Sequence, residues 1–153
     1  MTWRTATPAD AVALRDLERA ANVVGLAHVF ADLPFPDEGV LARWRSTLAD
    51  PSVTVLMTGA AFTSWDTGGR LRHLAVSPEH WGRGLAREGV ELAVAGIRAH
   101  GRTPTLWVLA ANRRARGLYD HLGWAPTGRE QPAEWPPHPV ELEYRLPESG
   151  HER

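Results

Sequence analysis

The chain has 153 residues, of which 43% are hydrophobic and 23% charged, and its net charge is -1 at pH 7. These values predict one soluble globular domain without a drive toward nucleic acid or anionic membranes. The chain has no cysteine, which excludes disulfides, thiolate metal sites and cysteine nucleophiles. All 17 basic residues are arginines, and the lack of lysine excludes Schiff-base and P-loop lysine chemistry.

The first third of the chain predicts a short strand followed by two helices. Residues 3–5 form the strand, and Thr7 and Pro8 begin a helix as its cap and first residue. The period is lost over 22–36, which indicates a loop or a broken helix, and a second helix begins at Asp37. The apolar side of the first helix is predicted to hold Val12, Leu14, Leu17 and Ala21.

The remaining elements alternate strands with helices. Strands are predicted at 53–57, 60–65, 70–77, 105–110 and 140–146, and helices at 82–99 and 112–122. One further strand is expected in the C-terminal part, so the order is β-α-α-β-β-β-α-β-α-β-β. This order predicts an α+β domain around one sheet over residues 1–146, with a tail at 147–153.

One turn, between the strand at 70–77 and the next helix, has the character of an anion site. Gly82 and Gly84 let the backbone approach a ligand, and the first N–H groups of a helix lack internal partners. Such a turn suits phosphates, and Arg83 and Arg87 add positive charge. A dinucleotide-binding fingerprint is excluded, because Arg87 stands in place of its third glycine. A plain glycine-containing helix start is the alternative.

A second motif lies in the helix at 112–122. Asn112 and Tyr119 are seven residues apart and therefore lie on nearly the same helix face. The alternative is that Asn112 only caps the helix and Tyr119 only packs in the core. The first motif reads Trp81-x-x-Gly84-x-Ala86 and is preceded by Leu74-x-Val76. The second reads Asn112-x-x-Ala115-x-x-Leu118-Tyr119 and is followed by Gly123-Trp124. Together, the two motifs resemble those of the GCN5-related N-acetyltransferase (GNAT) family.

The resemblance covers most of the chain and implies a fold and a cofactor. The fold is a GNAT-type α/β/α arrangement with a mixed, largely antiparallel sheet of about six to seven strands, splayed between the strands at 70–77 and 105–110. The cofactor is acetyl-CoA, with its pantetheine arm in that gap and its pyrophosphate on the glycine turn. The residues implied to bind it are Leu74, Ala75, Val76, Trp81, Gly82, Arg83, Gly84, Leu85, Ala86, Arg87 and Asn112.

The sequence departs from the family pattern at the glycine turn. Trp81 stands where the family commonly has Arg or Gln, so Arg83 or Arg87 is expected to supply the missing polar group. The run from Arg113 to Arg116 either meets the ribose phosphate of the cofactor or forms exposed helix surface.

The resemblance assigns one catalytic residue and leaves the general base open. Tyr119 is implied to lie near the thioester sulfur, where its hydroxyl either protonates the leaving thiolate or holds it by a hydrogen bond. Relatives often place a Glu or His base on the strand face that holds Leu74 and Val76, and this chain has Arg70 and Arg72 at those places. Both stay protonated and instead either bind an anionic acceptor or form a solvated face. His73, on the opposite strand face, is the remaining candidate. Three loop residues are expected to be turn formers or surface groups rather than bases: Asp66, Glu134 and His138.

We therefore predict an N-acetyltransferase that moves acetyl directly from acetyl-CoA to a primary amine of a small molecule, such as a metabolite, an amino-acid derivative or an antibiotic. The acceptor site is expected between 22–36 and 134–139. A non-catalytic acyl-CoA-binding or sensing module and a peptide N-terminal acetyltransferase stay open as alternative functions, and a homodimer is possible as the oligomeric state.

The seven histidines show no metal-ligand spacing, so no metal is expected. Without a signal-like or bilayer-spanning apolar run, a cytoplasmic protein is expected.

Overall fold

Seven strands form one sheet in the order β1-β2-β3-β4-β5-β7-β6 in the computed structural model, which describes residues 2–30 and 33–148. All neighbouring strands are antiparallel except β4 and β5, which confirms the predicted mixed, largely antiparallel sheet. The strands are β1 (Arg4–Thr5), β2 (Val53–Met57), β3 (Ala61–Asp66), β4 (Arg70–Val76), β5 (Thr105–Leu109), β6 (Ala125–Pro132) and β7 (Val140–Arg145).

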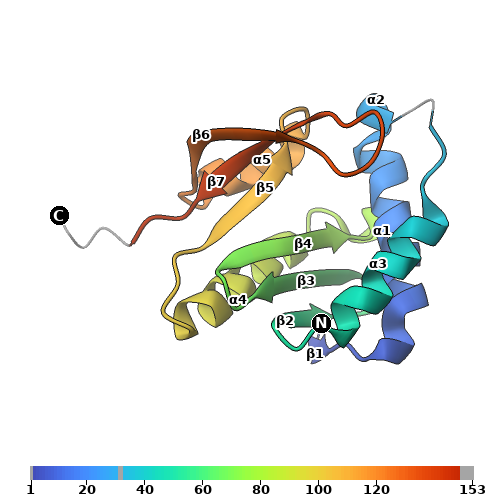
Figure 1. Cartoon of the computed structure of the whole chain (residues 1–153), viewed down its shortest axis with the longest axis horizontal. Helices are drawn as coiled ribbons and strands as arrows, with labels where there is room; N and C mark the ends of the chain where they lie inside the picture. The colour runs from blue at the N-terminus through green and yellow to red at the C-terminus, as the bar shows by residue number, and fades with distance from the viewer. Residues whose placement is uncertain (1, 31–32, 149–153) are drawn as a thin grey trace.

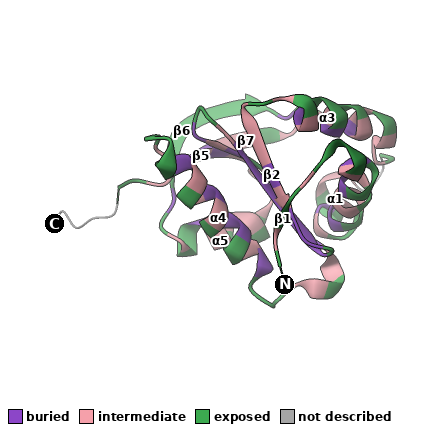
Figure 2. Cartoon of the chain, turned by 90° about the horizontal axis from the view of Figure 1, so that it is seen from below, coloured by how far each residue is buried: buried purple, intermediate pink, exposed green. Residues whose placement is uncertain are grey.

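Helices cover both faces of this sheet, as the three-layer prediction requires. α1 and α3 lie on one face, and α4 and α5 lie on the other (Figures 1 and 2). None of the helices in the described part of the chain is long and apolar enough to cross a membrane. The helices are α1 (Ala11–Gly25), α2 (Ala27–Phe30), α3 (Asp37–Ala49), α4 (Leu85–Ala99) and α5 (Arg113–His121), with 3-10 turns η1 (Pro8–Asp10) and η2 (Pro78–His80).

Each face of the sheet has its own apolar core. Val90, Ala93 and Ile97 of α4 are buried because they recur at helical spacing and pack on the strands. On the opposite face, Trp44 of α3 is fully buried and meets Phe62 edge-on, with ring centroids 5.0 Å apart. The residues with the least exposure in this second core include Leu14 of α1 and Val40 of α3.

The first helix differs from its prediction in its apolar side. Val12 is 45% exposed, so its predicted place in the core is wrong. α1 buries Ala11, Leu14 and Ala21, which follow one another at spacings that return to the same face, and Leu17 packs against the same core. The prediction is therefore confirmed for Leu14, Leu17 and Ala21. Over 22–30 the chain is a broken helix, because α1 runs on to Gly25 and α2 follows after Leu26, and 33–36 is not helical.

The sheet splays where it was predicted to. β4 and β5 pair only at Arg70 with Thr105 and Leu71 with Leu106, and beyond these pairs the two strands diverge (Figure 1). This gap lies between the N-terminal end of α4 and α5, where the two sequence motifs meet. Pro147 and Glu148 have no regular structure, and 149–153 of the predicted tail lie outside the described residues.

A bulge in β4 changes which side chains share a face. Ser64 pairs with His73 but Trp65 pairs with Leu71, so Arg72 is an extra residue in β4. Leu71 and Leu74 therefore both pack on the α4 side. Arg70 turns to the opposite face, and the prediction that Arg70 shares the face of Leu74 is wrong.

Candidate active site

The turn before α4 presents a row of backbone N–H groups. Gly82 and Gly84 both have φ of +81°, a left-handed conformation that glycine adopts without a steric cost. No described residue accepts a hydrogen bond from the N–H groups of 82–87. α4 begins at Leu85, so these groups lie at the positive end of its dipole. The turn therefore has the geometry of a phosphate site.

A cavity of about 380 Å³ adjoins this turn and extends between β4, α5 and the end of α1. Of the residues predicted to bind the cofactor, only Arg83 is not part of its lining. The predicted residues that line the cavity are Leu74, Ala75, Val76, Trp81, Gly82, Gly84, Leu85, Ala86, Arg87 and Asn112. The fold thus brings the two motifs, which are about 30 residues apart in the sequence, onto the walls of one site.

Trp81 forms a wall of this cavity. Its indole N–H donates to the main-chain carbonyl of Val76 at 2.8 Å, and the Arg114 guanidinium lies 3.8 Å from the ring centroid. A Cβ placed on Gly25 would lie 3.6 Å from the same ring, so α1 packs directly on it. The indole therefore engages one of the β4 carbonyls implied to pair with pantetheine, and it joins α1, β4 and α5.

The arginine run of α5 divides between two roles. Arg114 lines the cavity and covers Trp81, a role that sequence analysis left undecided. Arg116 instead donates to the Tyr144 hydroxyl at 3.1 Å and to the Ala110 carbonyl at 2.7 Å, so it supports the packing of α5. The signal in the sequence was the basic run itself, which does not say which arginine faces the site.

Asn112 combines the two roles considered for it. Its Oδ1 accepts from the backbone N–H of Ala115 at 3.1 Å, which caps α5. It also lines the cavity.

Tyr119 lies on the buried face of α5, in the core, and does not line this cavity. Its ring is 5% exposed and lies 5.8 Å from that of Trp124 and 6.3 Å from that of Tyr144, measured between centroids. Burial raises the pKa of the Tyr119 phenol. The phenol therefore stays protonated at neutral pH, which is the form that a proton donor requires.

His73 lies on the opposite face of the sheet from Tyr119. Its Nδ1 is 2.7 Å from the Ser64 hydroxyl oxygen, and its ring centroid is 4.8 Å from that of Trp44. Burial, and then the nearby charges of Arg43 and Arg72, lower the pKa of His73 well below its usual value. The imidazole is thus neutral at neutral pH, but the structure does not bring together the two predicted catalytic side chains.

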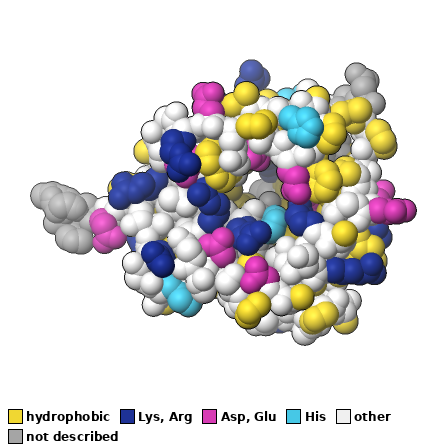
Figure 3. Space-filling view, viewed as in Figure 1, with side chains coloured by type: hydrophobic (Ala, Val, Ile, Leu, Met, Phe, Trp, Pro, Cys, Tyr) yellow, Lys and Arg dark blue, Asp and Glu magenta, His cyan; other side chains and the backbone are white. Residues whose placement is uncertain are grey.

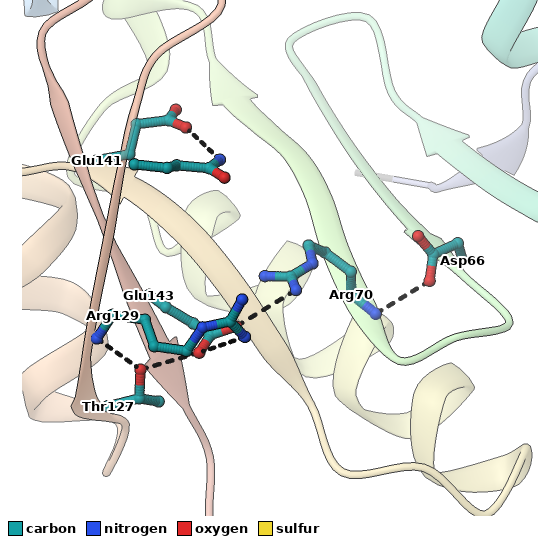
Figure 4. A network of polar contacts seen from close by, with 7 residues as sticks. Asp66, Arg70, Thr127, Arg129, Glu141 and Glu143 are labelled. Carbon is teal, nitrogen blue, oxygen red and sulfur yellow. Dashed lines mark hydrogen bonds and ion pairs between the residues drawn. The ribbon is translucent and has the colours of Figure 1, made fainter.

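Arg70 is engaged within the protein rather than solvated. Its guanidinium donates to Glu143 at 3.3 Å and lies 5.4 Å from the centroid of Trp107 (Figure 4). Glu143 is 5% exposed and also accepts hydrogen bonds from Thr127 and Arg129. Although burial acts to raise the pKa of Glu143, these partners lower it overall. The carboxylate is therefore charged and holds Arg70 in place.

Two of the three loop residues have the turn-forming roles expected of them. The Asp66 carboxylate accepts from the backbone N–H groups of Gly68 and Arg70 at 3.0 and 3.1 Å. The His138 Nδ1 lies 2.9 Å from the Ala133 carbonyl oxygen within the β6–β7 loop. Across the described ranges 2–30 and 33–148, no three His, Asp or Glu side chains gather as a metal site.

A second cavity, of about 640 Å³, lies beside the first. Asn22 and Leu26 line both cavities, so the two meet at the end of α1. The space-filling view shows this face of the molecule hollowed near its centre, where arginine and acidic side chains border the hollow, and it shows hydrophobic side chains gathered to one side of it, toward α1 and α2 (Figure 3). The walls come from the two segments predicted to border the acceptor and from α1 and α3: Glu18, Asn22, Val23, Leu26, Ala27, Phe30, Leu33, Pro34, Phe35, Pro36, Val40, Trp135 and Pro136.

Comparison with known proteins places this architecture in one family. The family described as FR47-like protein matches residues 54–131, which include β2 to β5, the glycine turn and α5. No match was found among curated protein sequences.

Solved structures share the fold at low sequence identity. The apo form of YjaB from Escherichia coli is 19% identical over 95% of this chain and 96% of that chain, with a TM-score of 0.73. A GCN5-related N-acetyltransferase from Rhodopseudomonas palustris is 14% identical over 94% and 92%, with a TM-score of 0.75. The putative acetyltransferase yncA from Salmonella typhimurium, solved with acetyl-CoA, is 20% identical over 99% and 96%, with a TM-score of 0.65.

Proposed function

The chain belongs to the FR47-like family of the GCN5-related N-acetyltransferases, and on that premise we propose that it transfers the acetyl group of acetyl-CoA to a primary amine of a small molecule. One observation carries the proposal. The glycine turn and the motif of α5 line a single cavity at the splay of β4 and β5, and this cavity meets a second one. Two adjoining cavities are what a reaction between two substrates requires.

The first cavity supports acetyl-CoA as the acetyl donor. The N–H groups of 82–87 are free to bind its pyrophosphate, and Arg87 adds positive charge at the same turn. Beyond Leu71 the edge of β4 that faces β5 is unpaired within the described residues, so its main chain offers peptide groups to the amides of the pantetheine arm, apart from the Val76 carbonyl that Trp81 already binds. Similar proteins solved with this cofactor or with coenzyme A, from Salmonella typhimurium and Thermoplasma acidophilum, agree with this assignment.

Direct transfer needs two proton movements. The amine nitrogen attacks the thioester carbonyl, a C–N bond forms and the C–S bond breaks, so the thiolate gains a proton and the amine loses one. We assign the first movement to the Tyr119 phenol, whose raised pKa keeps it protonated. Because Tyr119 does not line the cavity, we propose that its hydroxyl approaches the sulfur from the buried face of α5, where the sheet splays.

The second proton movement calls for a base. An alkyl ammonium group with a pKa of ~10 is mostly protonated at neutral pH, so the acceptor must be deprotonated before attack. His73 is neutral, but burial and the charges of Arg43 and Arg72 disfavour its protonated form, which makes it a weak base. Because its side chain also lines neither cavity, we propose that water in the site takes the amine proton.

Removal of one hydroxyl tests the proposal. Tyr119→Phe should lower kcat by about 10²-fold at an unchanged KM for acetyl-CoA, because the ring stays and the proton donor is lost. Thiol release from acetyl-CoA in the presence of a panel of amines gives both constants. The matched control is Tyr144→Phe, which removes the other phenol hydroxyl of the chain, bound by Arg116 at 3.1 Å, and should keep kcat.

The outcomes separate the enzyme from its alternatives. Coenzyme A at 100 times its dissociation constant should stabilise the fold by ~2.7 kcal/mol, and absence of a thermal shift would contradict the whole proposal. Binding without thiol release for any amine would support the non-catalytic acyl-CoA module instead. Wild-type kcat in Tyr119→Phe would remove Tyr119 from the mechanism.

A further inference from the structure

We propose that the acceptor is an apolar primary amine, an alkylamine or arylalkylamine, whose hydrocarbon body occupies the 640 Å³ cavity. The inference rests on the proposed function and narrows its acceptor class. It depends on three properties of this cavity, namely its apolar walls, the state of its one charged side chain and its junction with the cofactor cavity.

The walls are mainly apolar, with Glu18 and Asn22 as the polar side chains of the described lining. Phe30 comes from α2, Phe35 from the segment before α3, and Trp135 from the β6–β7 loop. A volume of 640 Å³ is within the range of small-molecule sites, which are lined mainly by hydrophobic and aromatic side chains. A hydrocarbon chain or an aromatic ring therefore gains free energy by leaving water for this cavity.

Trp135 is held against α3 by a small residue. A Cβ placed on Gly39 would lie 2.9 Å from two carbon atoms of the Trp135 ring, closer than real contacts allow. The indole therefore packs directly on the backbone of α3. The β6–β7 loop is thereby docked on α3, and the aromatic wall is formed before any acceptor binds.

The one charged side chain in the described lining is already paired. Glu18 accepts a hydrogen bond from the Trp44 indole at 2.8 Å and forms an ion pair with Arg43 that engages both of its carboxylate oxygens. It is therefore not free to bind a second ammonium group of a polyamine. Among the described lining residues there is also no cation to bind a carboxylate or phosphate. A second charge on the acceptor would be buried without a partner, which is costly.

The junction of the cavities sets the direction of the acceptor. Asn22 and Leu26 border both, and Asn22 provides an uncharged polar side chain at that point. An amine there faces the cofactor cavity while its hydrocarbon part extends toward Phe30 and Phe35. The rim is formed in part by Val23, which is 61% exposed and leaves the cavity open to solvent.

A set of three acceptors of equal length tests the inference. Heptylamine, 1,6-diaminohexane and 6-aminohexanoate differ in their far end, which is a methyl, an ammonium or a carboxylate group. We expect kcat/KM for heptylamine to exceed that of each charged analogue by about 10²-fold, because only the methyl end enters the apolar cavity without an unpaired charge. Thiol release at fixed acetyl-CoA gives the three constants.

A pair of neighbouring valines provides the matched variants. Val23→Glu places a carboxylate on the rim and should reduce the preference for heptylamine over 1,6-diaminohexane by about tenfold. Val24→Glu changes the same residue type one position along α1, at 54% exposure and outside the cavity lining, and should keep the wild-type preference. Both sites are exposed, so both variants should fold.

The results distinguish failure of this inference from failure of the proposed function. Loss of coenzyme A binding would contradict the proposed function itself. Coenzyme A binding with equal or better use of a charged analogue, or with no use of heptylamine, would overturn the apolar acceptor alone. An equal effect of Val23→Glu and Val24→Glu would show that the acceptor does not occupy this cavity.

Discussion

His73 is a titratable side chain whose surroundings disfavour its charged form. It lies between Ser64 and Trp44, and the guanidinium groups of Arg43 and Arg72 face it. In the unfolded chain a histidine titrates near pH ~6.5, whereas the folded protein holds the pKa of His73 well below that value. As the pH falls below the unfolded value, the unfolded state takes up a proton that the folded state does not, and stability is lost.

Replacement of His73 should therefore flatten the pH dependence of stability. His73→Gln keeps a hydrogen-bonding group toward Ser64 but does not titrate, so the loss of stability between pH 6.5 and 5.5 should be smaller than in the wild type by up to ~1.4 kcal/mol. Urea unfolding at pH 7.5, 6.5 and 5.5 gives the difference, with the measurement at pH 7.5 correcting for the lost contacts. Parallel curves for the two proteins would show that His73 titrates normally in the folded state.

Single residues were predictable from sequence only where a motif fixed their backbone. Gly82 and Gly84 lie at the turn that their spacing indicated, because their left-handed φ angles are a property of glycine. Arg70 was placed on the wrong face because a bulge at Arg72 interrupts the alternation, and nothing in the local sequence marks that bulge. The partner of Arg70, Glu143, is 73 residues away and could not be inferred from local pattern.

At the scale of elements, α4 packs very close to the sheet. A Cβ on Gly96 would lie 2.4 Å from the Trp65 ring, which is an impossible contact, so α4 approaches β3 only because this position is glycine. Gly117 of α5 is also helical, but it is exposed and a Cβ there meets nothing within 4 Å. The two glycines therefore differ in packing while sharing a helical backbone.

Alanine at these two positions should change stability in opposite directions. Gly96→Ala should destabilise the protein by ~1–3 kcal/mol through overpacking against Trp65. Gly117→Ala should stabilise it by ~0.5–1 kcal/mol, because glycine inside a helix is unfavourable relative to alanine. Urea unfolding of both variants checks the prediction, and stabilisation by Gly96→Ala would contradict the close approach of α4 to β3.

Elements with periodic sequences were predictable, and those without were not. The strands over 53–57 and 105–109 and the helix α3 lie where apolar spacing placed them. A strand was expected in the region of β6, but its first and last residues could not be predicted. All residues of β6 are exposed, so its sequence has no alternating apolar pattern. α4 begins at Leu85 rather than at residue 82, since left-handed glycines cannot continue a helix.

For the whole molecule, function depends on the point where the sheet opens. Two residue pairs join β4 to β5, and the strands then separate between the glycine turn and α5. The cofactor cavity adjoins that opening, and the apolar cavity meets it from the α1 and α3 side. Motifs in the sequence indicated the first cavity. The chemistry of the second was not evident from sequence, because its walls combine residues between 18 and 40 with Trp135 and Pro136, which only the fold brings together.

A crystal structure of the protein with coenzyme A tests this arrangement most directly. We expect the pyrophosphate to accept hydrogen bonds from the N–H groups of 82–87 and the pantetheine arm to lie along β4, with the sulfur directed toward Tyr119. Coenzyme A bound elsewhere, with the turn at 82–87 unoccupied at saturating ligand, would contradict the account.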